Sequence, residues 1–218
     1  DPARFFTVDR GNFVLNDDFL AFLEHEITTR RIGLVVLDSY TKLRSVRGSG
    51  ADIVKAEAND FTNLDRLAKK LHCVILVIHH DSKGSAALSW DQKGAGTYGI
   101  AASVDGLISI ERFAELDARA PERLIRVRGR HLPGTEFVAR LNDRLSYDFV
   151  INGGAAPLYP LLRQIEKAFG RDQVFSPKSL CMSLGFSRAT AHRVIGRLVA
   201  SDAVTKVGFG EYLLSVRL

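Results

Sequence analysis

The chain has 218 residues, of which 46% are hydrophobic and 25% are charged. These fractions are ordinary for globular proteins and exclude a low-complexity or collagen-like chain. The longest apolar runs have the length of strands, so we expect no membrane span. Cys73 and Cys181 lie in separate apolar stretches, which indicates a reduced, cytoplasmic protein without a disulfide framework.

The net charge of +5 is concentrated near the C-terminal end. Residues 155–218 contain nine Lys and Arg but four Asp and Glu, whereas residues 1–154 contain 21 of each sign. A neutral body followed by a basic region favours contact of that region with a polyanion such as DNA, and a solvated basic surface is the alternative. The chain opens with Asp1-Pro2 rather than an initiator Met, so we expect a piece of a longer protein.

Two continuous apolar runs with a helix between them dominate the first half of the chain. Residues 32–37 and 73–78 are each typical of a strand buried on both faces of a parallel sheet. The residues between them repeat apolar side chains at helical spacing and predict a helix of roughly twenty residues. A right-handed crossover makes the two strands of such a unit parallel. A helix over residues 16–27 is predicted to precede them, because Asp17 and Asp18 would lie in its first turn.

The middle of the chain changes character. A glycine-rich stretch, residues 83–99, is long enough to be a functional loop. A strand over residues 106–111 and three alternating segments after it predict an antiparallel edge made of hairpins. The segment Asn-Gly-Gly-Ala-Ala-Pro at 152–157 is the best candidate for a linker. It would separate a body of residues 1–152 from a small domain of residues 157–218.

The C-terminal domain has the pattern of three helices followed by a two-stranded hairpin, which predicts a winged-helix fold. Ser176 caps a helix that has Pro177 at its first position and ends at Gly185. Ser187 caps the next helix, and Gly208-Phe209-Gly210 forms the turn of the hairpin. The buried stripe of the helix after Ser187 is expected to be Ala191, Val194, Ile195, Leu198 and Val199.

The candidate site residues end the two apolar runs. Asp38 follows the first run, and the carboxyl edge of an open parallel sheet is where ligands bind. An apolar run followed by Asp also has the form of a Walker B motif, whose carboxylate holds nucleotide-bound Mg²⁺; an Asp that caps the next helix is the alternative. Ser39 is the next candidate for contact with the nucleotide. His79 and His80 end the second run, and they point to opposite faces, so at most one faces Asp38.

The motif LVVLDS at 34–39, followed by VILVIHHDSKG at 74–84, resembles hexameric RecA-like ATPases typified by the RepA replicative helicase of broad-host-range plasmids, with its phage and mobile-element relatives. The resemblance implies that Asp38 is the Walker B aspartate and that His79 and His80 carry the polar sensor, with Ser82-Lys83-Gly84 behind them. It covers about residues 1–151 and continues through Lys93-Gly94-Ala95-Gly96, Val104–Ile108 with Arg112, and Ile125–Arg130.

The resemblance implies an α/β fold: a RecA-like, mainly parallel sheet, incomplete at the N-terminus, with an antiparallel edge and a small winged-helix domain. It also implies ATP and Mg²⁺ as cofactors and a ring-shaped homo-oligomer. Lys83, Lys93 and Arg112 are candidates for a cation acting on the γ-phosphate of a neighbouring subunit, or they are surface cations. The chain has no G-x-x-x-x-G-K-[ST] motif and no match to the family's catalytic glutamate. We therefore expect this piece to hydrolyse ATP negligibly without an upstream Walker A segment.

Three other patterns suggest different sites. Gly94–Gly99 fits G-x-G-x-x-G, but no strand precedes it, so a dinucleotide site is rejected. A metallo-hydrolase built from Asp38, His79, His80 and Asp81 is a minor alternative, because adjacent histidines on a strand diverge. Trp90 either stacks on a base of single-stranded DNA or packs, and packing is favoured.

The helix after Ser187 resembles a DNA-recognition helix, and a protein-docking module is the alternative. Lys206 in the hairpin would touch phosphate. The residues expected to contact DNA from the helix are Ser187, Arg188, Thr190, Arg193 and Arg197. The sequence thus predicts part of a DNA-dependent ATPase, a replicative helicase or helicase loader of a plasmid, phage or mobile element. The alternative is a non-catalytic winged-helix DNA-binding regulator with a degenerate ATPase body.

Overall fold

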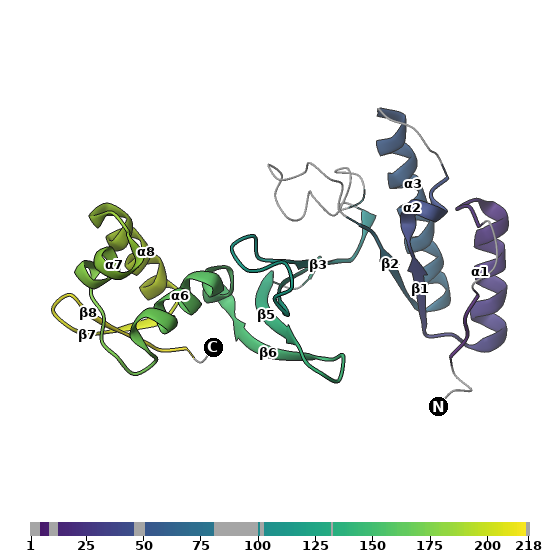
Figure 1. The fold of residues 1–218 in the computed structure, drawn as a ribbon. Helices are drawn as coiled ribbons and strands as arrows, with labels where there is room; N and C mark the ends of the chain where they lie inside the picture. The colour runs from purple at the N-terminus through teal and green to yellow at the C-terminus, as the bar shows by residue number, and fades with distance from the viewer. Residues whose placement is uncertain are drawn as a thin grey trace. The chain divides into compact units, whose positions relative to one another are not determined.

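A computed structural model describes residues 5–8, 13–45, 51–80, 100, 103–131 and 133–216. The architecture is mixed α/β, and the chain divides into two compact units, Asp1–Asp105 and Gly106–Leu218 (Figure 1). Each unit has its own apolar core. Over the described ranges, no helix is both long enough and apolar enough to cross a membrane.

The first unit alternates helices and strands: α1 (Asp17–Arg30), β1 (Leu34–Asp38), α2 (Tyr40–Leu43), α3 (Ala51–Leu71) and β2 (Val74–Ile78). α1 begins where the Asn16 side chain accepts a hydrogen bond of 2.9 Å from the Phe19 N–H, with Asp17 and Asp18 in its first turn. It ends at Arg31, whose φ of 54° breaks the helical path. The predicted first helix, the long helix and both strands are confirmed.

β1 and β2 pair in parallel, as predicted, from Leu34 beside Val74 to Asp38 beside Ile78. The expectation that both faces of these strands are buried is wrong. α1 and α3 pack on one face, which carries Val35, Leu37, Ile75 and Val77. The opposite face is 43–60% exposed and consists of Leu34, Val36, Val74 and Leu76. Both long helices of the described part of this unit cover the same face of the sheet. The side chains on the opposite face therefore remain exposed to solvent.

The second unit begins with a four-stranded antiparallel sheet of sequential strands, β3 (Gly106–Glu111), β4 (Glu122–Gly129), β5 (Thr135–Leu141) and β6 (Tyr147–Asn152). The predicted hairpins are therefore confirmed. The side-chain oxygen of Asn142 holds the turn between β5 and β6 by accepting hydrogen bonds from the N–H groups of Arg144 and Ser146, at 3.0 and 3.1 Å. The sheet contributes Leu124, Val138 and Ile151 to the core of this unit.

The segment expected to be a linker is a 3₁₀ helix, η3 (Gly153–Leu158). Ala155 and Ala156 are 2% and 0% exposed, and they lie in the same apolar cluster as the sheet and the helices that follow. Their small side chains allow the backbone to pack in the core instead of forming a flexible connection. The division between compact units lies after Asp105 rather than in this segment.

The rest of the second unit, the helix–hairpin region, consists of α6 (Tyr159–Phe169), α7 (Pro177–Leu184), α8 (Arg188–Ala200), β7 (Val204–Gly208) and β8 (Glu211–Leu214). The predicted caps are confirmed: Ser176 accepts from the Ser179 N–H, and Gly185 ends α7 with a φ of 70°. Phe175 forms an additional antiparallel bridge to Tyr212. The expected stripe of α8 is buried except for Val199, which is 41% exposed.

Candidate functional site

The candidate site of the first unit lies at the carboxyl edge of β1 and β2. Asp38 and Ile78 are partners in the parallel register, so Asp38 and His79 leave the same edge of the sheet on adjacent strands. The Asp38 side chain is exposed, His79 is half-buried and His80 is exposed. Parallel pairing thus brings Asp38 and the two histidines to one edge, as the sequence pattern predicts.

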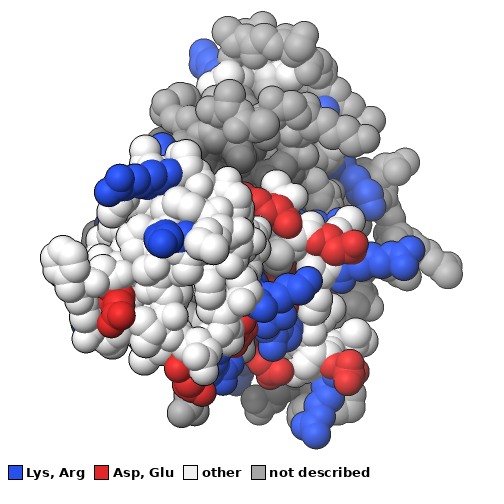
Figure 2. Space-filling view, turned by 60° about the vertical axis from the view of Figure 1, so that its left-hand side comes forward, with Lys and Arg blue, Asp and Glu red and all other residues white. Residues whose placement is uncertain are grey.

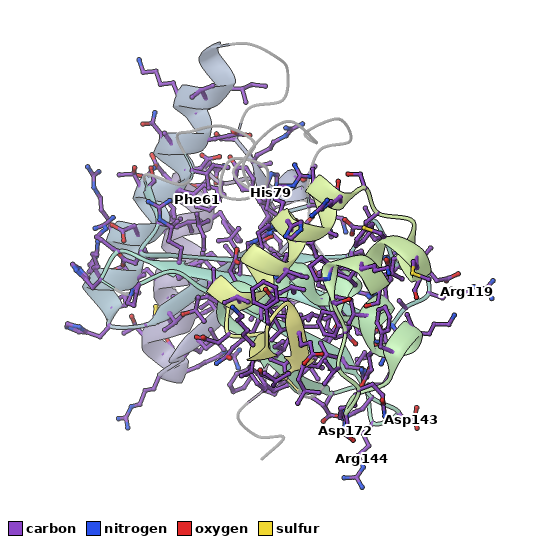
Figure 3. All side chains as sticks on the ribbon, turned by 90° about the vertical axis from the view of Figure 1, so that its left-hand side faces the viewer. Phe61, His79, Arg119, Asp143, Arg144 and Asp172 are labelled. Atoms are coloured by element: carbon purple, nitrogen blue, oxygen red, sulfur yellow. The ribbon has the colours of Figure 1, made fainter. Side chains whose placement is uncertain are left out.

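Tyr40 connects this edge to α3. Its side chain is 1% exposed, and its ring lies edge-on to the His79 imidazole with 5.7 Å between centroids. On the other side it contacts the ring of Phe61, at 4.9 Å between centroids. Figure 3 shows Phe61 and His79 near each other in this unit. The imidazole is therefore held from one side by an aromatic cluster that belongs to the core.

Asp60 on α3 fixes the position of Tyr40. The tyrosine hydroxyl donates a hydrogen bond of 3.0 Å to Asp60 Oδ2, and the N–H of Ser45 donates to the same oxygen at 3.1 Å. Asp60 is 5% exposed. Burial, together with the negative charge of Asp60, raises the pKa of Tyr40 far above its usual range, although Arg44 acts in the opposite direction. The segment that follows Asp38 is thus anchored by a buried carboxylate that accepts from two neutral donors.

The other candidates for the nucleotide site fall in different places. Ser39 is 5% exposed and precedes α2, where its side chain makes no capping hydrogen bond. Arg112 is exposed and belongs to the second unit, directly after β3. Lys83, Lys93 and Asp81, like the loop with Trp90, lie outside the described residues.

A shallow cavity of ≈ 270 Å³ lies beside Asp60, but it is a different place from the strand edge. Asp38 and His79 do not line it; the lining residues are Leu15, Asn16, Asp17, Leu20, Ser45, Asp60 and Asn63. We therefore assign the candidate site to the sheet edge and not to this cavity.

An exposed carboxylate at a strand end fits the Mg²⁺ of a bound nucleotide, because Mg²⁺ prefers oxygen ligands and is usually held by one or two carboxylates together with phosphate. Asp38 meets this condition. Within the part of the chain that the structure describes, no three His, Cys, Asp or Glu side chains gather as ligands for a metal ion.

The candidate DNA interface lies on α8. Arg188, Arg193 and Arg197 are exposed, and the last two are four residues apart, so they share one helical face. Ser187 and Thr190 have a structural role at the start of the helix: the Ser187 oxygen accepts from the Thr190 N–H at 3.1 Å, and the two hydroxyl oxygens lie 2.9 Å apart. Lys206 is exposed on β7, where it pairs with Tyr212.

Basic and acidic side chains are mixed on the face of the molecule that Figure 2 shows. In Figure 2, Lys and Arg side chains lie among Asp and Glu in one part of the view, and another part is mostly uncharged. Three exposed arginines on one short helix are therefore a more specific feature than the mixed charge of the face in Figure 2.

A second buried polar network holds the sheet of the second unit to α6. Glu122, which is 9% exposed, accepts from Arg140 Nε at 3.0 Å and from the Tyr159 hydroxyl at 3.2 Å. Arg140 also donates to the Tyr159 oxygen at 2.9 Å. Burial raises the pKa of Tyr159, and the hydrogen bond from Arg140 acts in the opposite direction.

Sequence reasoning missed Tyr40 and Asp60. An aromatic residue two positions after Asp38 is ordinary by itself, and Asp60 lies on the polar–apolar boundary of a long helix. An acidic residue at a position flanked by the apolar stripe of that helix was the available signal. No protein-family model matches the sequence, and no curated protein matches it either.

Proposed function

We propose that this chain is the C-terminal part of a RecA-like, Mg²⁺-ATP-dependent protein that acts on DNA, a replicative helicase or helicase loader of a plasmid, phage or mobile element. The observation that carries the proposal is the parallel register that brings Asp38 and His79 to one strand edge, with Tyr40 packed against the imidazole. The helix–hairpin region, in this proposal a winged helix, supplies the contact with DNA.

The roles follow from the position of each side chain. Asp38 is exposed at the strand end, where its oxygens can hold Mg²⁺ or a water bound to it. His79 is positioned by Tyr40 to sense the phosphate at the same edge. Bound ATP would supply the phosphoryl group for hydrolysis. The phosphate-binding loop is not among the 218 residues, so the proposal concerns a protein that carries one.

Lys83 and Arg112 remain candidates for a cation that acts in trans on a neighbouring subunit. This role requires a ring of identical subunits, which is the assembly that the proposal implies. A cation supplied across a subunit boundary stabilises charge that develops on the transferred phosphoryl group.

ATP hydrolysis by a chain extended upstream through a Walker A segment tests the catalytic part. We expect turnover that depends on Mg²⁺ and on DNA, and a loss of at least about 100-fold in Asp38→Ala, because one electrostatic contact to the transition state is worth this much. Asp65→Asn is the matched control, since Asp65 pairs with Lys69 on the surface of α3 at 2.8 Å. Equal activity of wild type and Asp38→Ala would remove the basis of the proposal.

A non-catalytic DNA-binding regulator is the second candidate function. The capped helix α8, with three exposed arginines and a hairpin directly after it, favours it. The two candidates share the DNA contact and differ at Asp38. DNA binding that is unchanged by ATP and by Asp38→Ala in the extended chain would favour the regulator.

DNA binding is tested with the full chain by fluorescence anisotropy at low and moderate salt. We expect the double variant Arg193→Ala/Arg197→Ala to bind duplex more weakly and to reduce the salt slope by about two, one for each lost phosphate contact. Arg119→Ala/Arg144→Ala removes the same charge from elsewhere in the second unit and is the control. Both of these arginines are exposed and point outward in Figure 3. Equal loss in both double variants would mean that net charge, and not α8, determines binding.

A further inference from the structure

The turn between β7 and β8 presents one aromatic ring to solvent. Gly208 pairs with Glu211, so Phe209 and Gly210 form a two-residue turn. Gly210 has a φ of 70°, a conformation that favours glycine. A Cβ placed on Gly208 would lie 2.5 Å from Oε2 of Glu211, so the end of this flexible side chain lies against Gly208. The tight turn therefore fixes the direction in which the Phe209 side chain leaves the hairpin.

Phe209 contributes little to the core, because its exposed fraction is 102%. The neighbouring Val207 is 50% exposed, so two apolar side chains are exposed near the tip of the hairpin, beside the charged Lys206 and Glu211. A ring held outward by a short turn loses little conformational freedom when it enters a binding partner. The structure thus places a preorganised apolar probe at the end of the hairpin.

The basic residues around this probe are complementary in charge to the phosphates of DNA. Lys206 is exposed on β7, and α8, with Arg193 and Arg197, ends immediately before the hairpin. Residues 155–218 carry nine basic and four acidic side chains. One of the acids, Glu211, lies beside the turn and would repel a phosphate there. The tip is therefore suited to the uncharged, stacked bases, while the basic residues behind it are suited to the phosphates.

We propose that Phe209 is a wedge that enters between neighbouring base pairs of duplex DNA and kinks the duplex, while α8 and Lys206 hold the phosphates. Apolar side chains that partly unstack a base step produce bends of this kind, usually from the minor groove. The inference rests on the proposed DNA binding of the helix–hairpin region and adds the mode of contact.

The test uses the full chain and a duplex of about 30 base pairs with a fluorescent donor and acceptor at its two ends, because a kink shortens the distance between the ends. We expect wild type to raise energy transfer. Phe209→Ala should bind about ten-fold more weakly, as expected for loss of one base–aromatic stack, with an unchanged salt slope and without the rise in transfer. Phe209→Leu should keep part of the bend, because leucine is also an apolar wedge.

Phe5→Ala is the matched control, since it removes a phenyl ring that is 77% exposed in the first unit. It should bind and bend DNA as wild type does. If Phe209→Ala binds and bends like wild type, the wedge is wrong and DNA binding stands. The wedge is also wrong if Phe209→Ala binds weakly but wild type leaves the duplex straight. If wild type shows no affinity for duplex even at low salt, both the wedge and the proposed DNA contact fail.

Discussion

Each of the two units buries a tyrosine hydroxyl beside a carboxylate, but they satisfy that carboxylate differently. In the first unit, Asp60 accepts from Tyr40 and from the N–H of Ser45, both neutral donors. In the second, Glu122 accepts from Tyr159 and from the guanidinium of Arg140, which also donates to the tyrosine. A charged donor offsets the cost of burying a carboxylate better than neutral donors do.

The two carboxylates also differ in what their networks connect. The network around Glu122 pairs opposite charges and connects the sheet to α6, which is a structural role. The network around Asp60 keeps a negative charge buried next to the strand edge that carries Asp38 and His79. Burial raises the pKa of both Tyr40 and Tyr159, so a raised tyrosine pKa does not distinguish the two units. The two networks therefore differ in the donors to the carboxylate and in the elements that they connect.

The largest expected effect comes from removing the carboxylate of the first network. Asp60→Ala leaves the Tyr40 hydroxyl and the Ser45 N–H without their acceptor and should destabilise the first unit by about 2–4 kcal/mol. Hydrogen exchange of α3 and of residues 40–45 measures the loss. Asp60→Asn keeps one oxygen acceptor at similar volume and should cost less. Equal losses in the two variants would show that the acceptor is not what Asp60 contributes.

The next prediction compares the stability lost when the hydroxyl of each buried tyrosine is removed. Tyr40→Phe should cost about 1–3 kcal/mol, because the buried Asp60 loses one of two neutral donors, whereas Tyr159→Phe should cost about 1 kcal/mol, because Glu122 keeps Arg140. Urea unfolding combined with hydrogen exchange in each unit gives both values. A larger cost for Tyr159→Phe than for Tyr40→Phe would contradict the expected difference between the two networks.

The parts of the fold set by local residues could be predicted from the sequence. Asn16, Ser176 and Ser187 cap their helices through contacts within three residues, and the two serine caps were predicted as such. The alternation of β4, β5 and β6 and the apolar runs of β1 and β2 also predicted strands in the right pairing.

The features that the sequence did not predict all depend on which distant surface covers a residue. Strand composition could not show that α1 and α3 pack on one face of β1 and β2. Val199 continues the apolar stripe in sequence but is turned away from the core. Ala155 and Ala156 have the composition of a linker, yet small side chains also fit a tight core. Tyr40 and Asp60 are 20 positions apart, so only the folded chain connects them.

A smaller effect is the response of stability to pH. Burial and the charge of Asp60 raise the pKa of Tyr40 in the folded chain, whereas in the unfolded chain it ionises near its ordinary value of about 10. The stability that the neutral hydroxyl provides is thus complete below pH 10 and is lost as the pH rises above it, by at most about 1.4 kcal/mol per pH unit. Urea unfolding between pH 8 and 11 should show a steeper decline for wild type than for Tyr40→Phe. Parallel declines would contradict the assignment.

The smallest expected effect comes from removing the cation of the second network, which leaves its carboxylate without a charged donor, as in the first network. The Arg140 side chain is 37% exposed, so Arg140→Met alone should cost about 1 kcal/mol, because water replaces part of the lost pairing. Without the guanidinium, Glu122 depends on the Tyr159 hydroxyl as Asp60 depends on Tyr40. Tyr159→Phe should then cost about 0.5–1 kcal/mol more in the Arg140→Met background than in wild type. A double-mutant cycle in urea isolates this coupling, and Arg144→Met, which removes an exposed arginine from the turn between β5 and β6, serves as the uncoupled control. A coupling of zero would mean that the cation of the second unit does not determine how much its tyrosine matters, and the contrast between the two networks would then rest on burial alone.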